Sequence, residues 1–403
     1  MALLIIIFLM LYAVVVYYVA RFVIVLKFKK RKTRLVNQLK YYGYYALTLS
    51  YTVSTFIAGI LVLLYNLDCL IHTHGQLLII IVSNYIIISL IVMYATNPEL
   101  EVRNYFEHNI KLVMLCVSSV SFVITILIIA SVLFETYKFF KIVSITDFLT
   151  SMHWSPSDDV QNANLGKKFG IIPLLVGTLL ITFISLVVAT PIGIFSAIFL
   201  SEYTDNKLRF LLKPIVEMLS GIPTVVYGYF AALYMGPYIR NVGESYHFTV
   251  SSESALAAGI VLGVMVIPYV ISLADDMFKS IPDSIREASF ALGATKFETI
   301  IKIVVPAAKS GLVGAVMLAF SRAIGETMIV TMASGLMARL TFNPLDSVTT
   351  VTAQIVSILT GDQEFNNIKT LAAFALAFTL FCLTLILNFF AHNFMIKYQN
   401  QFR

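Results

Sequence analysis

Residues 279–311 read KSIPDSIREASFALGATKFETIIKIVVPAAKSG and lie between two long apolar runs, 254–275 and 311–334. An apolar run of roughly 20 residues is long enough to cross the hydrocarbon core of a bilayer. The quoted stretch therefore predicts a short polar connection between two membrane helices. Two helices are expected within it, because Gly293 suits the end of the first, and Thr295 and Glu298 form a capping box that begins the second.

The ends of these two short helices have further signals. Ser280 is expected to cap the first helix. Pro306 is expected to end the second, because proline disfavours helical geometry at the preceding residue, Val305. The alternative is one amphipathic helix lying on the lipid surface, but such a helix needs no sharp turn at its middle.

The composition of the whole chain agrees with a membrane protein. Of its 403 residues 59% are hydrophobic and 12% are charged, whereas about a quarter of a soluble chain is charged. Alternating segments typical of β-barrels are absent from the sequence, so we predict an all-α polytopic membrane protein with about nine transmembrane helices. The predicted spans are 2–26, 42–65, 77–95, 110–134, 170–200, 214–238, 254–275, 311–334 and 371–396.

Lysine and arginine residues gather in the loops on one side of these spans, above all in 27–40 and 276–310. Positively charged loops usually stay in the cytoplasm, which predicts an N-outside, C-inside orientation. The same asymmetry explains the net charge of +6. The charge therefore requires no nucleic-acid partner, and membrane lipids are the expected surroundings.

Two parts of the chain differ in their content of glycine and proline. Residues 1–109 contain few glycines or prolines and are predicted to form an accessory three-helix membrane module. Residues 110–403 are predicted to form the working six-helix part. In the second part, residues that kink helices or let them approach closely fall inside predicted spans: Pro191, Pro223, Pro268, Gly221, Gly228, Gly263 and Gly325.

The connection 279–306 carries a family motif. The spacing Glu-Ala-Ala-x3-Gly-x9-Ile-x-Leu-Pro, known as the EAA motif, is kept by six residues: Glu287, Ala288, Ser289, Gly293, Ile303 and Pro306. Ser289 stands in place of the second alanine and Val305 in place of leucine. The chain therefore resembles the permeases of ABC importers. The resemblance implies a six-helix type I permease core with three extra N-terminal helices, in which 279–306 is the coupling loop for a cytoplasmic ATPase.

Four further stretches narrow the resemblance: FLTSMHWSP (148–156), LSEYTDNKLR (200–209), KPIVEMLSGIPTVVYGYF (213–230) and RAIGETMIV (322–330). Together they are similar to the C-type permeases of Pst phosphate importers, over about 135–396. The resemblance implies import of inorganic phosphate through a bacterial inner membrane. The implied partners are a second, A-type permease, two ATPase subunits and a periplasmic phosphate-binding protein.

ATP chemistry is not expected in this chain. Its sequence has no Gly-x4-Gly-Lys-Ser/Thr phosphate loop. The chain is therefore expected to be a transport subunit rather than an enzyme, without a cofactor of its own. ATP and Mg are expected on the partner ATPase.

Arg322 and Glu326 are charged residues within the eighth predicted span, where a charge costs about 2.5–3.5 kcal/mol and normally faces a bundle interior or an aqueous path. At i, i+4 spacing they are expected to share a helix face. A guanidinium suits phosphate because it donates paired hydrogen bonds. We hypothesise that Glu326 neutralises Arg322 when the path is empty, with Ser321 and Thr327 as neutral donors. The alternative is a buried ion pair that locks two helices together.

Other candidates are less specific. Glu217 lies one turn before Gly221 and Pro223, and either faces the headgroups or takes part in gating the path. Asp275 and Asp276 are expected at the membrane interface. Trp154 is expected to be an interfacial aromatic anchor, with an external docking surface as the alternative.

Cys69, His72 and His74 form a cluster that is too small for a complete metal site, so no metal is predicted. Two rival functions stay open. One is a secondary anion transporter that works without an ATPase, and the other is a signalling or scaffold subunit. Within the importer hypothesis, another oxyanion such as sulfate is an alternative substrate.

Overall fold

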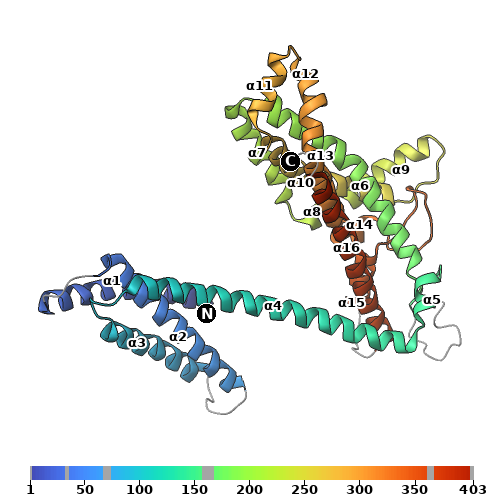
Figure 1. The fold of residues 1–403 in the computed structure, drawn as a ribbon. Helices are drawn as coiled ribbons and strands as arrows, with labels where there is room; N and C mark the ends of the chain where they lie inside the picture. Colours follow the sequence, from blue (N-terminus) through green and yellow to red (C-terminus); the bar gives the residue numbers. More distant parts are fainter. Residues whose placement is uncertain (1, 32–35, 67–73, 157–167, 361–366, 400–403) are drawn as a thin grey trace. The chain divides into compact units, whose positions relative to one another are not determined.

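The computed structural model describes residues 2–31, 36–66, 74–156, 168–360 and 367–399. These residues contain helices and two isolated bridges but no β-strand, so the predicted all-α fold is confirmed. The chain forms two compact units, 1–128 and 129–403. The boundary falls inside one continuous helix, α4 (Val102–Ile142), which begins in the first unit and ends in the second (Figure 1).

Unit 1 consists of α1 (Ala2–Arg31), α2 (Leu39–Asn66), α3 (His74–Ala95) and the first part of α4. On α1, Tyr12, Val16 and Ala20 recur every four residues and therefore lie on one face. This face packs against Ala46 of α2 and Tyr85 of α3. The three helices thus bury a common apolar seam.

One lysine of the basic segment has a structural role in unit 1. The Nζ of Lys27, on α1, donates hydrogen bonds to the carbonyl oxygens of Met93, Tyr94 and Thr96, at 3.0, 2.6 and 2.8 Å. A cation at the carboxyl end of a helix satisfies carbonyls that have no partner within the helix. Lys27 therefore holds the end of α3 against α1.

Unit 2 contains the end of α4 and all later elements. They are α5 (Ile145–Thr150), α6 (Ile172–Ile198), η2 (Phe199–Tyr203), α7 (Asn206–Ser220), α8 (Thr224–Phe230), η3 (Ala231–Met235), α9 (Gly236–Ser245), α10 (Ala255–Lys279), α11 (Asp283–Ala291), α12 (Lys296–Thr299), η4 (Ile300–Val304), α13 (Val305–Ile324), α14 (Met328–Ala333), α15 (Val351–Leu359) and α16 (Ile368–Gln399). Figure 1 shows α11 and α12 at one end of this unit and α5 and α15 at the opposite end.

The centre of unit 2 is the packing of α6 on α10. A Cβ atom at Gly259 of α10 would lie 2.7 Å from the Cβ of Ile184, and one at Gly263 would lie 2.9 Å from the Ser185 carbonyl oxygen. Glycines that face a neighbouring helix let the two backbones approach closely. The α6–α10 pair therefore forms the scaffold on which the other helices of unit 2 pack.

Within the described residues, seven helices are long and apolar enough to cross a membrane, and eight if a bent pair counts as one span. That pair is Asn206–Ser220 with Thr224–Ser245, bent by 79°. Another predicted span, 77–95, falls on α3, whose described apolar stretch Ile79–Ala95 is shorter than those seven helices. The count of nine and the orientation stay predictions.

Two predicted spans are not single straight helices. The span 214–238 is interrupted after Ser220, because Gly221 closes α7 and Pro223 takes an extended backbone (φ −56°, ψ 134°) before α8. The span 311–334 is interrupted after Ile324, where Gly325 closes α13. Glycine and proline thus end these helices inside the predicted spans instead of merely kinking them.

Trp154 is not an interfacial anchor. It is 6% exposed and packs edge-to-face against Phe169, with ring centroids 5.9 Å apart. Phe139, Phe148 and Leu174 complete a buried cluster around these two rings. The aromatic residue that the sequence suggested for the lipid interface is therefore part of the core of unit 2.

Candidate functional site

The turn of the coupling loop forms as predicted. Gly293 has a φ of +83°, the left-handed conformation that ends α11. The capping box is also confirmed. The amide of Glu298 donates to Thr295 Oγ1 at 3.3 Å, and the amide of Thr295 donates to Glu298 Oε2 at 3.0 Å.

Two predicted helix ends in the loop are wrong. Pro282, and not Ser280, takes the N-cap position of α11; Ser280 Oγ instead donates to the Met277 carbonyl, at the end of α10. Pro306 does not stop the second helix, because Val305 keeps helical angles (φ −63°, ψ −45°). The wider π-helical turn η4 precedes Pro306. We attribute the unbroken run from η4 into α13 to this turn, because it relieves the clash between the proline ring and the carbonyl one turn earlier.

The departure from the EAA motif at Ser289 has a physical explanation. Ser289 and Thr299 are both almost fully buried, and their hydroxyl oxygens lie 2.8 Å apart. The hydrogen bond joins α11 to α12 across the turn. Alanine at this position could not make the bond, so the serine is matched to the threonine opposite it.

An ion pair that the sequence analysis missed anchors the loop to the rest of unit 2. Arg286 Nη2 lies 2.8 Å from Glu202 Oε1, and the two side chains are 15% and 8% exposed. The same guanidinium donates to the carbonyl oxygens of Phe278 and Ile281 at 2.7 and 2.8 Å. Arg286 therefore ties α11 to η2 and to the end of α10. No regular spacing links residues 202 and 286, so only the fold could reveal the pair.

The outer surface of the loop presents several exposed apolar side chains. Leu292 is 89% exposed and Phe297 is 63% exposed, and Ile285, Phe290 and Ile301 are also exposed. Glu287 and Ala288 of the EAA motif are exposed beside them, whereas Ile303 and Pro306 are half-buried. An apolar patch at the tip of a helical turn is typical of a docking surface for another protein.

Arg322 and Glu326 do not share a helix face. Because α13 ends at Ile324, Arg322 lies in its last turn and Glu326 lies beyond the interruption. Within the described residues the two side chains form no ion pair; Arg322 Cζ lies 3.9 Å from the ring centroid of Tyr269, on α10. Glu326 Oε1 accepts a hydrogen bond from the amide of Met328 at 3.1 Å. The hypothesis that Glu326 directly neutralises Arg322 is therefore unsupported by the geometry.

The neutral donors lie at the same interruption. Ser321 Oγ lies 2.6 Å from Asn388 Oδ1, on α16, a residue that the sequence analysis missed. Thr327 Oγ1 lies 3.4 Å from the Gly325 carbonyl, so it hydrogen-bonds its own backbone. The fold thus brings Arg322, Ser321 and Thr327 to the end of α13, with Tyr269 and Asn388 from neighbouring helices.

The two interrupted spans meet. Helix α8, which follows the first interruption, packs against α14, which follows the second. A Cβ atom at Gly228 would lie 2.9 Å from Met332 Sδ and 3.2 Å from the Met328 carbonyl oxygen. In secondary transporters, discontinuous membrane helices typically form the substrate site. Arg322 is exposed on the surface of this chain, at the start of the second interruption.

Glu217 and Asp275 have different surroundings from each other. Glu217 is exposed on α7, with one carboxylate oxygen 4.0 Å from Lys213 Nζ. Asp275 is fully buried and is bound by both Arg209 and Lys213, the second at 3.1 Å. Asp275 is therefore enclosed by protein, whereas Asp276 beside it is exposed, and their position at the membrane interface stays a prediction. Asp275 joins α10 to α7.

Cys69 and His72 lie outside the described residues, as does the side chain of His74. Among the side chains that the structure does describe, no group of three or more His, Cys, Asp or Glu residues could hold a metal ion.

The model of a family described as "Binding-protein-dependent transport system inner membrane component" matches residues 189–395, which is more than half of the chain. The chain belongs to this family. Its predicted resemblance to ABC importer permeases is therefore confirmed, and the matched residues include the coupling loop and both interruptions.

Individual relatives agree. The Bacillus subtilis protein named "Probable ABC transporter permease protein YqgH" is 35% identical over 244 residues, 60% of this chain and 75% of the relative. The Haemophilus influenzae "Phosphate transport system permease protein PstC" is 33% identical over 270 residues, 62% of this chain and 81% of the relative. A bacterial ABC transporter involved in the import of alginate matches with a TM-score of 0.50 at 12% identity, over 74% of this chain and 99% of that chain. This last likeness shows the fold alone.

Proposed function

We propose that the chain is the transmembrane permease subunit of an ATP-driven, binding-protein-dependent importer of inorganic phosphate. The assignment of phosphate as the substrate rests on the exposed guanidinium of Arg322, which lies where a predicted span is interrupted. A guanidinium stays charged and donates paired hydrogen bonds to an oxyanion. The similarity to phosphate transport permeases supports the same substrate.

A second permease subunit is part of the proposal. Arg322 lies on an exposed face of this chain, beside the exposed Leu318. A charge at membrane depth needs protein or water around it. A second, A-type permease opposite this face would enclose an aqueous path between the two subunits. Glu326, Ser321 and Thr327 would line the same path, with Glu326 fixed by the Met328 amide instead of by Arg322.

Two ATPase subunits and a periplasmic phosphate-binding protein complete the proposed importer. The exposed apolar tip of the coupling loop, with Leu292 and Phe297, would seat on one ATPase. ATP-driven movement of the loop would pass through Arg286 to Glu202 and to the end of α10. ATP and Mg would bind to the ATPases and not to this chain.

The proposed importer lies in the bacterial inner membrane, with the coupling loop in the cytoplasm. Residues 110–403 are proposed as the permease core, and residues 1–109 as an accessory module. Glu217, exposed on α7 just before the first interruption, is proposed as a residue of the path or its gate.

Uptake of radiolabelled phosphate by cells that express this chain with its partners tests the proposal. Arg322→Gln should abolish uptake while the ATPase still co-purifies, because the coupling loop is unchanged. Gly293→Asp should abolish uptake and also release the ATPase, because residue 293 has a φ of +83° in the turn of the loop.

Two outcomes would contradict the proposal. Uptake by the Gly293→Asp variant without any ATPase would indicate a secondary anion transporter. Competition by sulfate, together with unchanged phosphate uptake in Arg322→Gln, would indicate a different substrate or a different path.

A further inference from the structure

A cavity of about 310 Å³ opens on unit 2 between α7 and the end of α10, and its lining does not include Arg322, Ser321 or Thr327. Three cations line it: Arg209, Lys213 and Lys279. Asn206 lines it as well, and Glu217 is the acidic residue among its lining. The proposed function uses Glu217 from this lining and gives no role to the three cations.

The guanidinium of Arg209 is held in place before any ligand binds. Arg209 is nine-tenths buried, and its Nη2 donates to both carboxylate oxygens of Asp275. The other guanidinium nitrogens make no hydrogen bond within the described part of the chain, and the side chain is 10% exposed. Because Arg209 lines the cavity, these free N–H groups form a fixed donor set for an oxyanion.

Three carboxylates, Asp275, Asp276 and Glu217, lie near the cations of the lining, and their ion pairs involve Arg209 and Lys213 but not Lys279. Lys213 Nζ lies 3.1 Å from Asp275 and 3.2 Å from Asp276, so both acids are engaged by Lys213, and Asp275 by Arg209 as well. Lys279, in the last turn of α10, is exposed and has no ion pair within the described residues.

The acidic residue of the lining, Glu217, lies far along α7 from the guanidinium of Arg209. Glu217 is two turns from Arg209 along α7, roughly 12 Å at the usual rise per residue. The basic part of the cavity thus gathers Arg209, Lys279 and the Asn206 amide.

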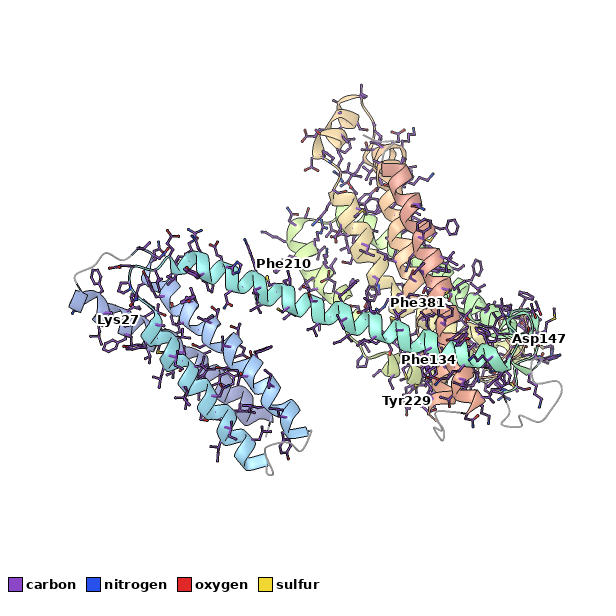
Figure 2. The ribbon with its side chains drawn as sticks, turned by 60° about the horizontal axis from the view of Figure 1, so that its bottom comes forward. Lys27, Phe134, Asp147, Phe210, Tyr229 and Phe381 are labelled. Atoms are coloured by element: carbon purple, nitrogen blue, oxygen red, sulfur yellow. The ribbon has the colours of Figure 1, made fainter. Side chains whose placement is uncertain are left out.

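The apolar lining fits the carbon part of a phosphate ester. Pro214 lines the cavity, as does Phe210, which is 83% exposed (labelled in Figure 2). The neighbouring Leu211, Ile215 and Met218 on α7 are also exposed, so this amphipathic helix offers apolar surface beside the cations. Such a helix is suited to lie among lipid headgroups.

We propose that this cavity binds a phosphate group, with the free N–H groups of Arg209, the ammonium of Lys279 and the Asn206 amide as donors. The phosphate could come from the headgroup of an anionic phospholipid or from free inorganic phosphate, since both present the same oxyanion. The site is distinct from Arg322. A ligand here would join α7 to the end of α10, directly before the coupling loop.

The test uses the purified full chain in nanodiscs and compares Lys279→Gln with Lys207→Gln. Lys207 is an exposed lysine of α7 that does not line the cavity, so its substitution matches the change in charge at Lys279. Binding of radiolabelled inorganic phosphate is measured in phosphatidylcholine nanodiscs. Retention of phosphatidylglycerol is measured by native mass spectrometry. Asn206→Ala serves as a second cavity variant.

Because a hydrogen bond to a charged group is stronger than a neutral one, Lys279→Gln should weaken binding about tenfold, and Lys207→Gln should not. Loss of phosphate binding alone identifies free phosphate as the ligand, and loss of phosphatidylglycerol alone identifies the headgroup. Equal binding of both probes by all variants, or equal weakening by both lysine substitutions, overturns the proposal. Neither measurement needs the ATPase or transport, so failure of the proposed function would not produce these results.

Discussion

Arg286→Gln is the substitution that tests most directly how the coupling loop is held. The wild-type guanidinium contacts the Glu202 carboxylate and the carbonyl oxygens of Phe278 and Ile281. Glutamine is shorter, uncharged and cannot reach all three groups. In the variant, the Glu202 carboxylate therefore loses its cation, although its side chain is only 8% exposed.

The magnitude follows from the burial of the pair. Removing one partner of a buried ion pair costs about 3–5 kcal/mol. Since the Arg286 side chain keeps 15% exposure, we expect the lower end of that range, about 3 kcal/mol in the free energy of unfolding. The matched control is Lys302→Gln, in the same loop. It removes the ion pair between Lys302 and Glu298, whose side chains are 71% and 43% exposed, respectively. This loss should lower the free energy of unfolding by less than about 1 kcal/mol.

The assay is unfolding of the purified chain by increasing fractions of sodium dodecyl sulfate in mixed micelles, followed by circular dichroism. Co-purification of the ATPase and ATP-dependent phosphate uptake are measured in parallel. Arg286→Gln should retain ATPase binding, because the exposed tip of the loop is unchanged, but should lose most uptake. Equal unfolding free energies for the Arg286 and Lys302 variants would refute the proposed anchor, as would normal uptake by Arg286→Gln.

Three further substitutions have expected outcomes in the same unfolding assay. Gly293→Ala should cost about 1–2 kcal/mol from backbone strain alone, because the space around the added Cβ is open, and Gly293→Asn should cost less. Ser289→Ala should cost about 1 kcal/mol, since it removes the buried hydrogen bond to Thr299; no change would mean that the bond contributes nothing. Gly259→Leu should destabilise the chain by about 1–3 kcal/mol, because the added Cβ would lie 2.7 Å from the Cβ of Ile184; wild-type stability would contradict the close α6–α10 packing.

Local signals in the sequence predicted the local geometry of the coupling loop well. Gly293 and the pair Thr295 and Glu298 determine a turn and a helix start through their own backbone and the next four residues. These predictions were correct because their causes are short-range. Pro306 was wrongly expected to end a helix, since the rule for proline assumes an ordinary α-helical turn before it. The π-helical turn η4 changed that condition.

The candidate path was predicted only in part. The charges at Arg322 and Glu326 stood out within an apolar run, so the sequence located them. Their relation was wrong because i, i+4 spacing implies a shared face only in an uninterrupted helix. Gly325 was read as a kink, whereas it closes α13. The stacking of Arg322 on Tyr269 joins two helices far apart in the sequence and leaves no pattern in either.

The sequence by itself determined the all-α membrane class of this protein and, through motif spacing, its resemblance to importer permeases, because apolar length, glycine and proline positions and motif spacing are properties of one segment at a time. Only the tertiary structure decided which charges meet. Arg286 pairs with Glu202, and Arg209 with Asp275, across 84 and 66 residues of chain. Such pairs depend on how α6, α7 and α10 pack, and a buried charge is stable only where packing supplies its partner.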